Sequence, residues 1–174
     1  MIYVLDACAM IAFLADELGA DVVEQALLEE GSQCIAHSIN LCEVFYGYHR
    51  AGGETAATDA IDDLLAAGAQ ERSDIDEVFW KEVGKLKANG KVSIADCFAI
   101  ALTNRVGGTL LTSDHHEMDP LAATGVCPIT FIQVSKSFFA LLPKTVNCFH
   151  LTSTSTGAAS CASYPSGQFE MFTP

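Results

Sequence analysis

Short apolar runs alternate with helix-forming segments along the first 132 residues of this chain, and this alternation limits the possible folds more than any other feature. Strands buried on both faces are continuous apolar runs, and the helices between parallel strands cover those faces. The pattern therefore predicts an α/β fold with a short central parallel sheet covered by helices. The expected strands are residues 2–5, 34–37, 109–112 and 129–132, with the last at an edge. The expected helices are residues 7–17, 20–30, 41–48, 54–67, 74–88 and 93–106.

The composition of the chain changes near Ile132. Residues 1–132 carry 21 of the 22 acidic side chains and 7 of the 9 basic ones, whereas the remaining residues carry one acid and two bases. Beyond Ile132 no period of 3.6 or 2 is sustained, and Ser and Thr cluster between residues 151 and 160. We therefore predict one domain over residues 1–132 and a C-terminal extension of unknown structure over residues 133–174.

The formal net charge of −13 bears on the partners of this chain. An acidic surface repels phosphates, so a function on nucleic acid would need metal ions or a local basic patch. No apolar run reaches the roughly 20 residues of a membrane helix, and none of the seven cysteines forms a C-x-x-C pair. We expect a soluble cytoplasmic protein with reduced thiols. Its candidate contacts to phosphate are Arg50, Arg72, Lys81, Lys85, Lys87, Lys91 and Arg105.

Four acidic residues stand where the predicted fold would bring them together. Asp6 and Asp114 come just after two predicted strands, and open parallel sheets bind ligands beyond the carboxyl ends of their strands. Glu43 and Asp96 lie within apolar helical segments, which would desolvate their carboxylates against the sheet. Neither has a Lys or Arg three or four residues away. Such acids would repel each other and stay protonated unless a divalent metal ion held them together.

Each of these acids also has a purely structural explanation. Asp6 or Asp114 could cap the helix that follows it, and Glu43 could lie on the solvent side of its helix. Ser93 and Asp96 have the spacing of a capping box, in which the serine caps the helix and the acid reaches back. A cap does not exclude catalysis. Four structural explanations in this order along one chain are also less probable together than any one of them.

Four segments of the chain resemble a known family. They are YVLDA (3–7), NLCEVFYG (40–47), SIADC (93–97) and LTSDH (111–115). Their order and spacing resemble those of the PIN domain, the nuclease fold of VapC-type toxins in bacterial and archaeal toxin–antitoxin pairs. The extension over residues 133–174 has no counterpart that we identify in this family.

The resemblance implies a three-layer α/β/α fold and a metal-dependent ribonuclease. The catalytic and metal-binding acids of the family map onto Asp6, Glu43, Asp96 and Asp114. Asp119 resembles an additional acid that some members carry, and Thr112 or Ser113 resembles a hydroxyl that supports the site. The ion would be Mg²⁺ or Mn²⁺, because carboxylate oxygens are hard ligands. The implied partners are an RNA substrate, a small antitoxin protein and a second copy of the chain in a homodimer.

Other interpretations fit the residues less well. A haloacid-dehalogenase-like phosphatase also begins with a strand that ends in Asp, but Cys8 stands where its second acid should be. A cysteine phosphatase needs an Arg six residues after its Cys, and none of the cysteines here has one. His115, His116 and Cys127 lack a fourth ligand at the spacing of a zinc site. A PIN-like module that binds RNA or a partner without catalysis is the alternative function.

Overall fold

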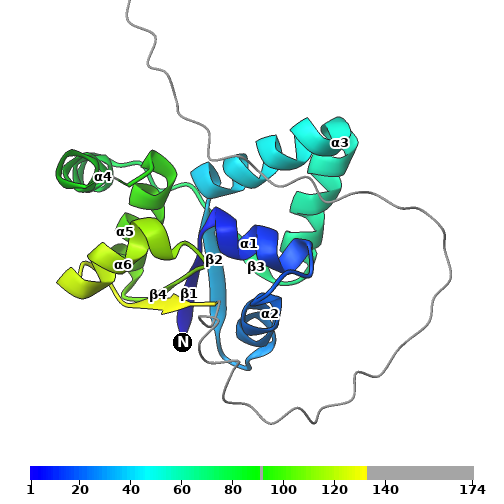
Figure 1. The fold of residues 1–174 in the computed structure, drawn as a ribbon, viewed down its shortest axis with the longest axis horizontal. Helices are drawn as coiled ribbons and strands as arrows, with labels where there is room; N and C mark the ends of the chain where they lie inside the picture. Colours follow the sequence, from blue (N-terminus) through cyan, green and yellow to red (C-terminus); the bar gives the residue numbers. More distant parts are fainter. Residues whose placement is uncertain (91, 133–174) are drawn as a thin grey trace, which may run out of the picture. The chain divides into compact units, whose positions relative to one another are not determined.

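The structure, a computed structural model, describes residues 1–90 and 92–132 (Figure 1). Five strands within them form one sheet, and every neighbouring pair is parallel. The order across the sheet is β3-β2-β1-β4-β5, so the first strand lies at the centre. The last strand lies at an edge, as predicted. The strands are β1 (Ile2–Leu5), β2 (Gln33–His37), β3 (Ala69–Arg72), β4 (Thr109–Thr112) and β5 (Ile129–Phe131).

The helices of the described residues run between the strands. α3 consists of two helical segments that meet at Gly53, whose φ of 82° is open to glycine at little cost. The expected helices 41–48 and 54–67 are therefore one element with a kink. The helices are α1 (Ala7–Leu14), α2 (Ala20–Leu28), α3 (Ser38–Ala66), α4 (Glu77–Asn89), α5 (Ile94–Val106) and α6 (His115–Thr124).

Alternate residues of the strands point into two separate cores. Leu5 and Leu111 pack with residues of α1, α2 and α3 on one face of the sheet. Val4 and Leu110 pack with residues of α4, α5 and α6 on the other face. Since side chains along a strand alternate between faces, this division confirms the three-layer α/β/α fold with a short parallel sheet.

Two elements of the structure are not predicted by the sequence. β3 has the polar sequence AQER and lies at an edge, where its pairing with β2 holds it in place. α6 contains Pro120, a residue that usually ends a helix. Both elements depend on their place in the fold rather than on a local pattern.

Three further expectations concern membrane-spanning helices, the cysteine thiols and the C-terminal extension. No helix among the described residues is long and apolar enough to cross a membrane. The five cysteines in this part of the chain are free, and Cys34, Cys97 and Cys127 are buried. The predicted extension lies outside the described residues, so the domain boundary at Ile132 stays a prediction.

Candidate active site

The carboxyl ends of β1 and β4 form the part of the sheet where a ligand is expected. The chain builds the sheet from β1 toward β3 and then crosses to β4 on the other side of β1. Open parallel sheets bind ligands at such a switch in strand order. Asp6 and Asp114 follow β1 and β4, and the backbone N–H of Asp6 donates to the carbonyl oxygen of Leu111 at 3.3 Å. Asp6 and Asp114 therefore lie at the same end of the sheet, just beyond the carboxyl ends of its strands.

Asp6 is a fully buried acid. Its Oδ1 caps α1 by accepting a hydrogen bond from the backbone N–H of Ala9 at 2.7 Å. Its Oδ2 is buried and has no hydrogen-bond partner. The pKa of Asp6 is raised to about 7, chiefly by burial and further by the charges of Asp114 and Glu43. Thr112 and the Ala9 N–H lower the pKa and so partly oppose this rise. An orphaned carboxylate oxygen of this kind is costly unless something binds it.

Asp114 caps α6 and is joined to Asp6 through Thr112. Its Oδ1 accepts from the backbone N–H groups of His116 and Glu117 at 2.8 and 3.1 Å. The backbone N–H of Asp114 donates to Thr112 Oγ1 at 3.0 Å, and the Thr112 hydroxyl also lowers the pKa of Asp6. Thr112 is fully buried, and its hydroxyl therefore lies between the two acids. The predicted supporting role of Ser113 stays a prediction.

Asp96 stands in the first turn of α5 beside a second acid, Glu117. Ser93 caps this helix, since its Oγ accepts from the Asp96 N–H at 3.0 Å. The Glu117 Oε2 accepts from the Ser93 N–H at 2.7 Å. One carboxylate oxygen from each of Asp96, Asp114 and Glu117 lies within 4.8 Å of the others. Burial raises the pKa of Asp96, as do the charges of Asp6 and Glu117, while Ser93 opposes the shift.

Glu43 reaches the same group from α3. Its side chain is half-buried and accepts a hydrogen bond from the Tyr46 hydroxyl at 3.3 Å. Burial raises the pKa of Glu43, the Tyr46 bond lowers it, and the charge of Glu117 raises it. The structure therefore brings Asp96, Asp114 and Glu117 together, and the charges of Asp6 and Glu43 act on members of this group.

The sequence points to Asp119, but the structure brings Glu117 to the group instead. Asp119 is exposed and bonds His115 Nδ1 at 3.0 Å. On a helix, a residue three positions after Asp114 shares its face, whereas one five positions after it turns away. The signal for Glu117 was its spacing of three from Asp114, and it could be used only once α6 was known. The part of Asp119 in metal binding stays a prediction.

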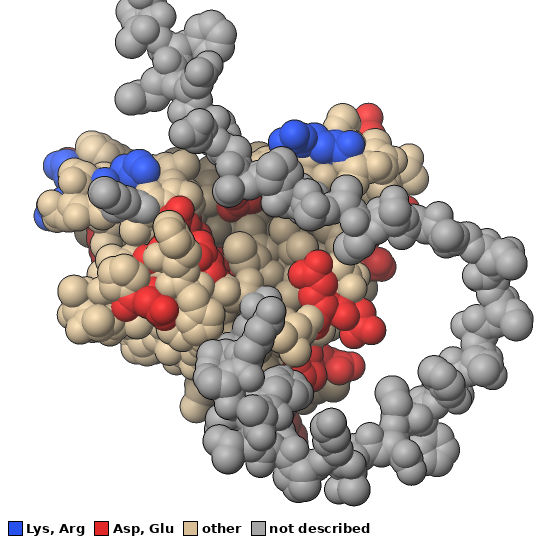
Figure 2. Space-filling model, in the orientation of Figure 1, with Lys and Arg blue, Asp and Glu red and all other residues tan. Residues whose placement is uncertain are grey.

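The donor set of this site fits a hard divalent cation. All the side chains are carboxylates, one buried oxygen of Asp6 is orphaned, and no Lys or Arg pairs with these acids anywhere in residues 1–90 and 92–132. Figure 2 shows acidic side chains over α5 and α6, with Lys and Arg over α4 to one side and over α3 to the other. Oxygen-only ligands suit Mg²⁺ and Mn²⁺ better than zinc.

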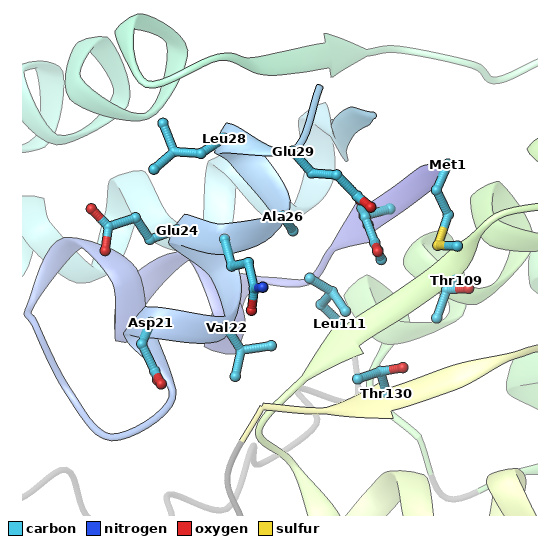
Figure 3. Close-up of a pocket in the computed structure, with 12 residues that line it drawn as sticks. Met1, Asp21, Val22, Glu24, Ala26, Leu28, Glu29, Thr109, Leu111 and Thr130 are labelled. Atoms are coloured by element: carbon cyan, nitrogen blue, oxygen red, sulfur yellow. The ribbon is translucent and has the colours of Figure 1, made fainter. Parts of the chain in front are cut away.

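A pocket of about 680 Å³ lies elsewhere, between α2 and the strands β1, β4 and β5 (Figure 3). Its walls include Tyr3, Leu111 and Thr130 of the sheet and Asp21 and Glu24 of α2. None of the five clustered acids lines it. The candidate active site is therefore the acidic edge of the sheet, and this pocket is separate from it.

Comparisons with known proteins identify the family of this chain and structures of similar fold. The model of the PIN domain family matches residues 3–121. The structure is similar to VapBC2 from Rickettsia felis, solved with promoter DNA, with a TM-score of 0.61 and 15% identity over 75% of this chain and 98% of the other. For VapBC-1 of nontypeable Haemophilus influenzae the TM-score is 0.57, with 18% identity over 76% and 98% of the chains.

A third similar structure carries a statement of substrate. It is Mycobacterium tuberculosis VapC20, described as a toxin that cleaves the sarcin-ricin loop, with a TM-score of 0.54 and 14% identity over 69% of this chain and 95% of the other. At these identities the three likenesses establish the fold alone. A comparison with curated protein sequences gives no significant match.

Proposed function

The chain belongs to the PIN-domain family, and from this premise we propose that it is a metal-dependent ribonuclease, the toxin of a toxin–antitoxin pair. The observation that carries the proposal is the buried, orphaned Oδ2 of Asp6 within a group of carboxylates that has no cationic partner among the described residues. A merely structural acid in such a place would have a Lys or Arg beside it.

Asp6, Glu43, Asp96 and Asp114 are the residues that would hold Mg²⁺ or Mn²⁺. Such an ion activates a water molecule and neutralises charge that develops on the phosphate during hydrolysis. The raised pKa values of Asp6 and Asp96 mean that both carboxyls hold protons up to near-neutral pH until a cation displaces them. The Thr112 hydroxyl holds the backbone of Asp114, and the N-terminal N–H groups of α1 and α6 fix one carboxylate oxygen of Asp6 and one of Asp114.

Glu117 strengthens the proposed site beyond the four acids that the family resemblance implies. Its carboxylate lies beside those of Asp96 and Asp114, and its bond to the Ser93 N–H fixes it there. We assign it to the same metal-binding group. The same hydrogen bond joins α6 to the start of α5, the two helices that carry Glu117 and Asp96.

The partners follow from the family and from the solved neighbours. Two similar structures are VapBC complexes, each of a toxin with its antitoxin, and we propose a small antitoxin for this chain. A basic side chain of that partner placed toward the acids would replace the charge of the metal. RNA is the proposed substrate, a homodimer the proposed assembly and the cytoplasm the proposed place of action.

The test is hydrolysis of RNA by the full chain with Mg²⁺ or Mn²⁺. Cleavage should stop with chelator, and Asp6→Asn should reduce it by at least about a hundredfold while the protein stays folded. Asp62→Asn is the matched control, because Asp62 is exposed on α3 and should be neutral. A folded wild-type protein that binds RNA or an antitoxin but never hydrolyses RNA would instead be the non-catalytic PIN-like module.

A further inference from the structure

The pocket between α2 and the sheet leaves apolar side chains open to solvent. Among the residues that line its volume of about 680 Å³ are Tyr3 and Leu111 of the sheet and Val22 and Leu28 of α2 (Figure 3). Leu28 is 75% exposed. Apolar surface in a pocket favours an occupant, because covering that surface removes it from water.

The last described residue, Ile132, lies at the edge of this pocket. A side chain on Gly19 would bring its Cβ within 2.5 Å of the Ile132 carbonyl oxygen, so the backbone of Ile132 lies against the residue that precedes α2. Asp21 and Val22, just after Gly19, line the pocket, and so does Thr130, two residues before Ile132. Residue 133 therefore begins beside the pocket.

The segment that follows has side chains of the kind that such a pocket would accept. Residues 133–141 have the sequence QVSKSFFAL. Their large apolar side chains are Val134, Phe138, Phe139 and Leu141. A Phe ring that leaves water for an apolar pocket contributes more than most side chains to stability. The segment therefore offers apolar surface of its own to the open side chains of α2 and the sheet.

The charges of the pocket and of the segment are opposite. Asp21, Glu24 and Glu29 line the pocket, and none of its lining residues is Lys or Arg. The Met1 ammonium, also at the pocket, donates to a backbone carbonyl oxygen at 3.2 Å. Lys136 is the one charged residue of the segment. The segment therefore brings a positive charge to an acidic rim without adding a negative one.

Nine residues are long enough to cover the pocket. Ile132 lies level with Thr112, because its N–H donates to the Thr112 carbonyl oxygen at 2.9 Å. The pocket reaches along β4 to Thr109, three residues away, which is about 10 Å of strand. Nine residues span about 13 Å as a helix and about 30 Å when extended. The segment can therefore turn back over the pocket in either form.

We propose that residues 133–141 occupy this pocket in their own chain and cover the open face of β4 and β5 beside α2. The apolar side chains of the segment pack against those of the pocket, and Lys136 offsets the charge of its acids. β5 has only three residues, and a cover on this face stabilises so short an edge strand. The compact domain then extends past Ile132, and the pocket is filled by the chain itself.

The test is a double-mutant cycle in the full chain, measured by thermal melting. Leu28→Ser changes an exposed side chain and should be nearly neutral if the pocket is empty, but it should lower the melting temperature by several degrees if the segment covers it. The pair Phe138→Ser and Phe139→Ser should lower it by at least about 5 °C. All three changes together should cost clearly less than the sum, because both sides of the cycle remove the same contact.

Two controls match these variants in chemistry but not in place. Leu65→Ser changes an exposed leucine of α3 that does not line the pocket, and its effect should simply add to that of the Phe138 and Phe139 pair. The pair Phe169→Ser and Phe172→Ser removes two rings beyond the segment and should leave the melting temperature unchanged.

Hydrogen exchange of the wild-type full chain gives an independent measurement. Amides of residues 133–141 should exchange at least about tenfold more slowly than those of residues 151–160, because a docked segment shields its backbone. Additive effects of Leu28→Ser and the Phe138 and Phe139 pair, or no protection of residues 133–141, overturn the inference. Coupling that grows with protein concentration also overturns it, since the segment would then come from a second copy. The measurements use neither RNA nor metal, so they are independent of the proposed ribonuclease.

Discussion

Acidic side chains gather in two regions of this molecule, and the regions differ in their partners. At the carboxyl ends of β1 and β4, Asp6 is buried and Asp96 is half-buried among other carboxylates, and desolvation is the main cause that raises the pKa values of both. Before α4, Asp74 and Asp76 bond the guanidinium groups of Arg72 and Arg105. Those hydrogen bonds lower the pKa values of both carboxyls, that of Asp76 to about 2.

Helix capping does not distinguish the two regions, since both contain it. Asp76 caps α4 by accepting from Val78 and Phe79, much as Asp6 caps α1 and Asp114 caps α6. What differs is the cation: the acids of one region have their guanidinium groups, and those of the other lack any Lys or Arg partner in the described chain. The missing charge, rather than the cap, distinguishes the region that we propose to bind a metal ion.

Activity should divide the two regions most sharply. Asp96→Asn should lower RNA cleavage by at least about a hundredfold, because it removes a ligand for the ion that stabilises developing charge. Asp76→Asn should leave the cleavage rate nearly unchanged and lower the melting temperature instead. Rates of cleavage and thermal melts of the two purified variants provide the comparison. Equal losses of activity would erase the distinction.

The dependence of stability on pH should have opposite signs in the two regions. In metal-free protein the folded state holds the Asp6 proton up to about pH 7, whereas the unfolded chain loses it near the ordinary value of 3.8. Stability should therefore fall as the pH rises from about 4 to about 7, by an amount on the order of a few kcal/mol. Denaturant melts with chelator across this range measure it.

Asp74 and Asp76 should contribute the opposite trend at lower pH. Their folded pKa values are depressed, so the unfolded chain takes up protons first, and their stabilisation is lost as the pH falls from about 4 toward about 2. Asp96→Asn should flatten the neutral slope and Asp76→Asn should keep it. A wild-type protein whose stability rises steadily from about pH 4 to 7 in chelator would contradict the raised pKa of Asp6.

A divalent metal ion should stabilise the protein through the acids at the carboxyl ends of β1 and β4, and not through Asp74 and Asp76. A ligand that binds only the folded protein adds about 2.7 kcal/mol at a concentration one hundred times its Kd. Millimolar Mg²⁺ or Mn²⁺ should raise the melting temperature, and more at pH 8 than at pH 5, because the carboxyls must lose their protons first. Asp96→Asn should shrink this rise, whereas Asp76→Asn should preserve it. Identical melting curves with and without metal would count against the site.

Removal of a cation should be the mildest change. Arg105→Gln takes the guanidinium from Asp74 and Asp76 and from its contact with the Phe79 ring, 4.6 Å from the centroid. The melting temperature should fall modestly, and less in high salt, because exposed ion pairs are already screened there. Arg50→Gln is the control, since Arg50 has no ion pair in the described structure. A larger fall in melting temperature for Arg50→Gln than for Arg105→Gln would contradict the stabilising role of the Arg105 ion pairs.

The sequence predicts those parts of the site that follow from the sheet. Asp6 and Asp114 could be placed because each comes after a short apolar strand, and parallel strands end at one edge. Glu43 and Asp96 could be suspected because their apolar neighbours force them toward the core. These inferences need only periodicity and the cost of desolvation, so they survive without knowledge of the tertiary structure.

The remaining features are set by contacts distant in sequence. β3 is a strand because it pairs with β2, with Ala36 opposite Glu71. Its sequence has no alternation of polar and apolar residues that would predict a strand. α6 runs through Pro120, which argues locally against a helix. Without α6, Glu117 has no defined direction and Asp119 is as good a candidate. The Tyr46 bond to Glu43 likewise becomes visible only when the side chains are placed.

The central position of β1 also orders events during synthesis. β1 leaves the ribosome before the other four strands, yet its neighbour β4 lies more than a hundred residues later in the chain. At about 5–20 residues per second, Asp6 waits roughly 5–20 s for Asp114 to appear. During that interval the edge of β1 that later pairs with β4 is open, and Asp114 is absent from the carboxyl end of β1. A chain interrupted before β4 therefore exposes an open strand edge, which favours aggregation.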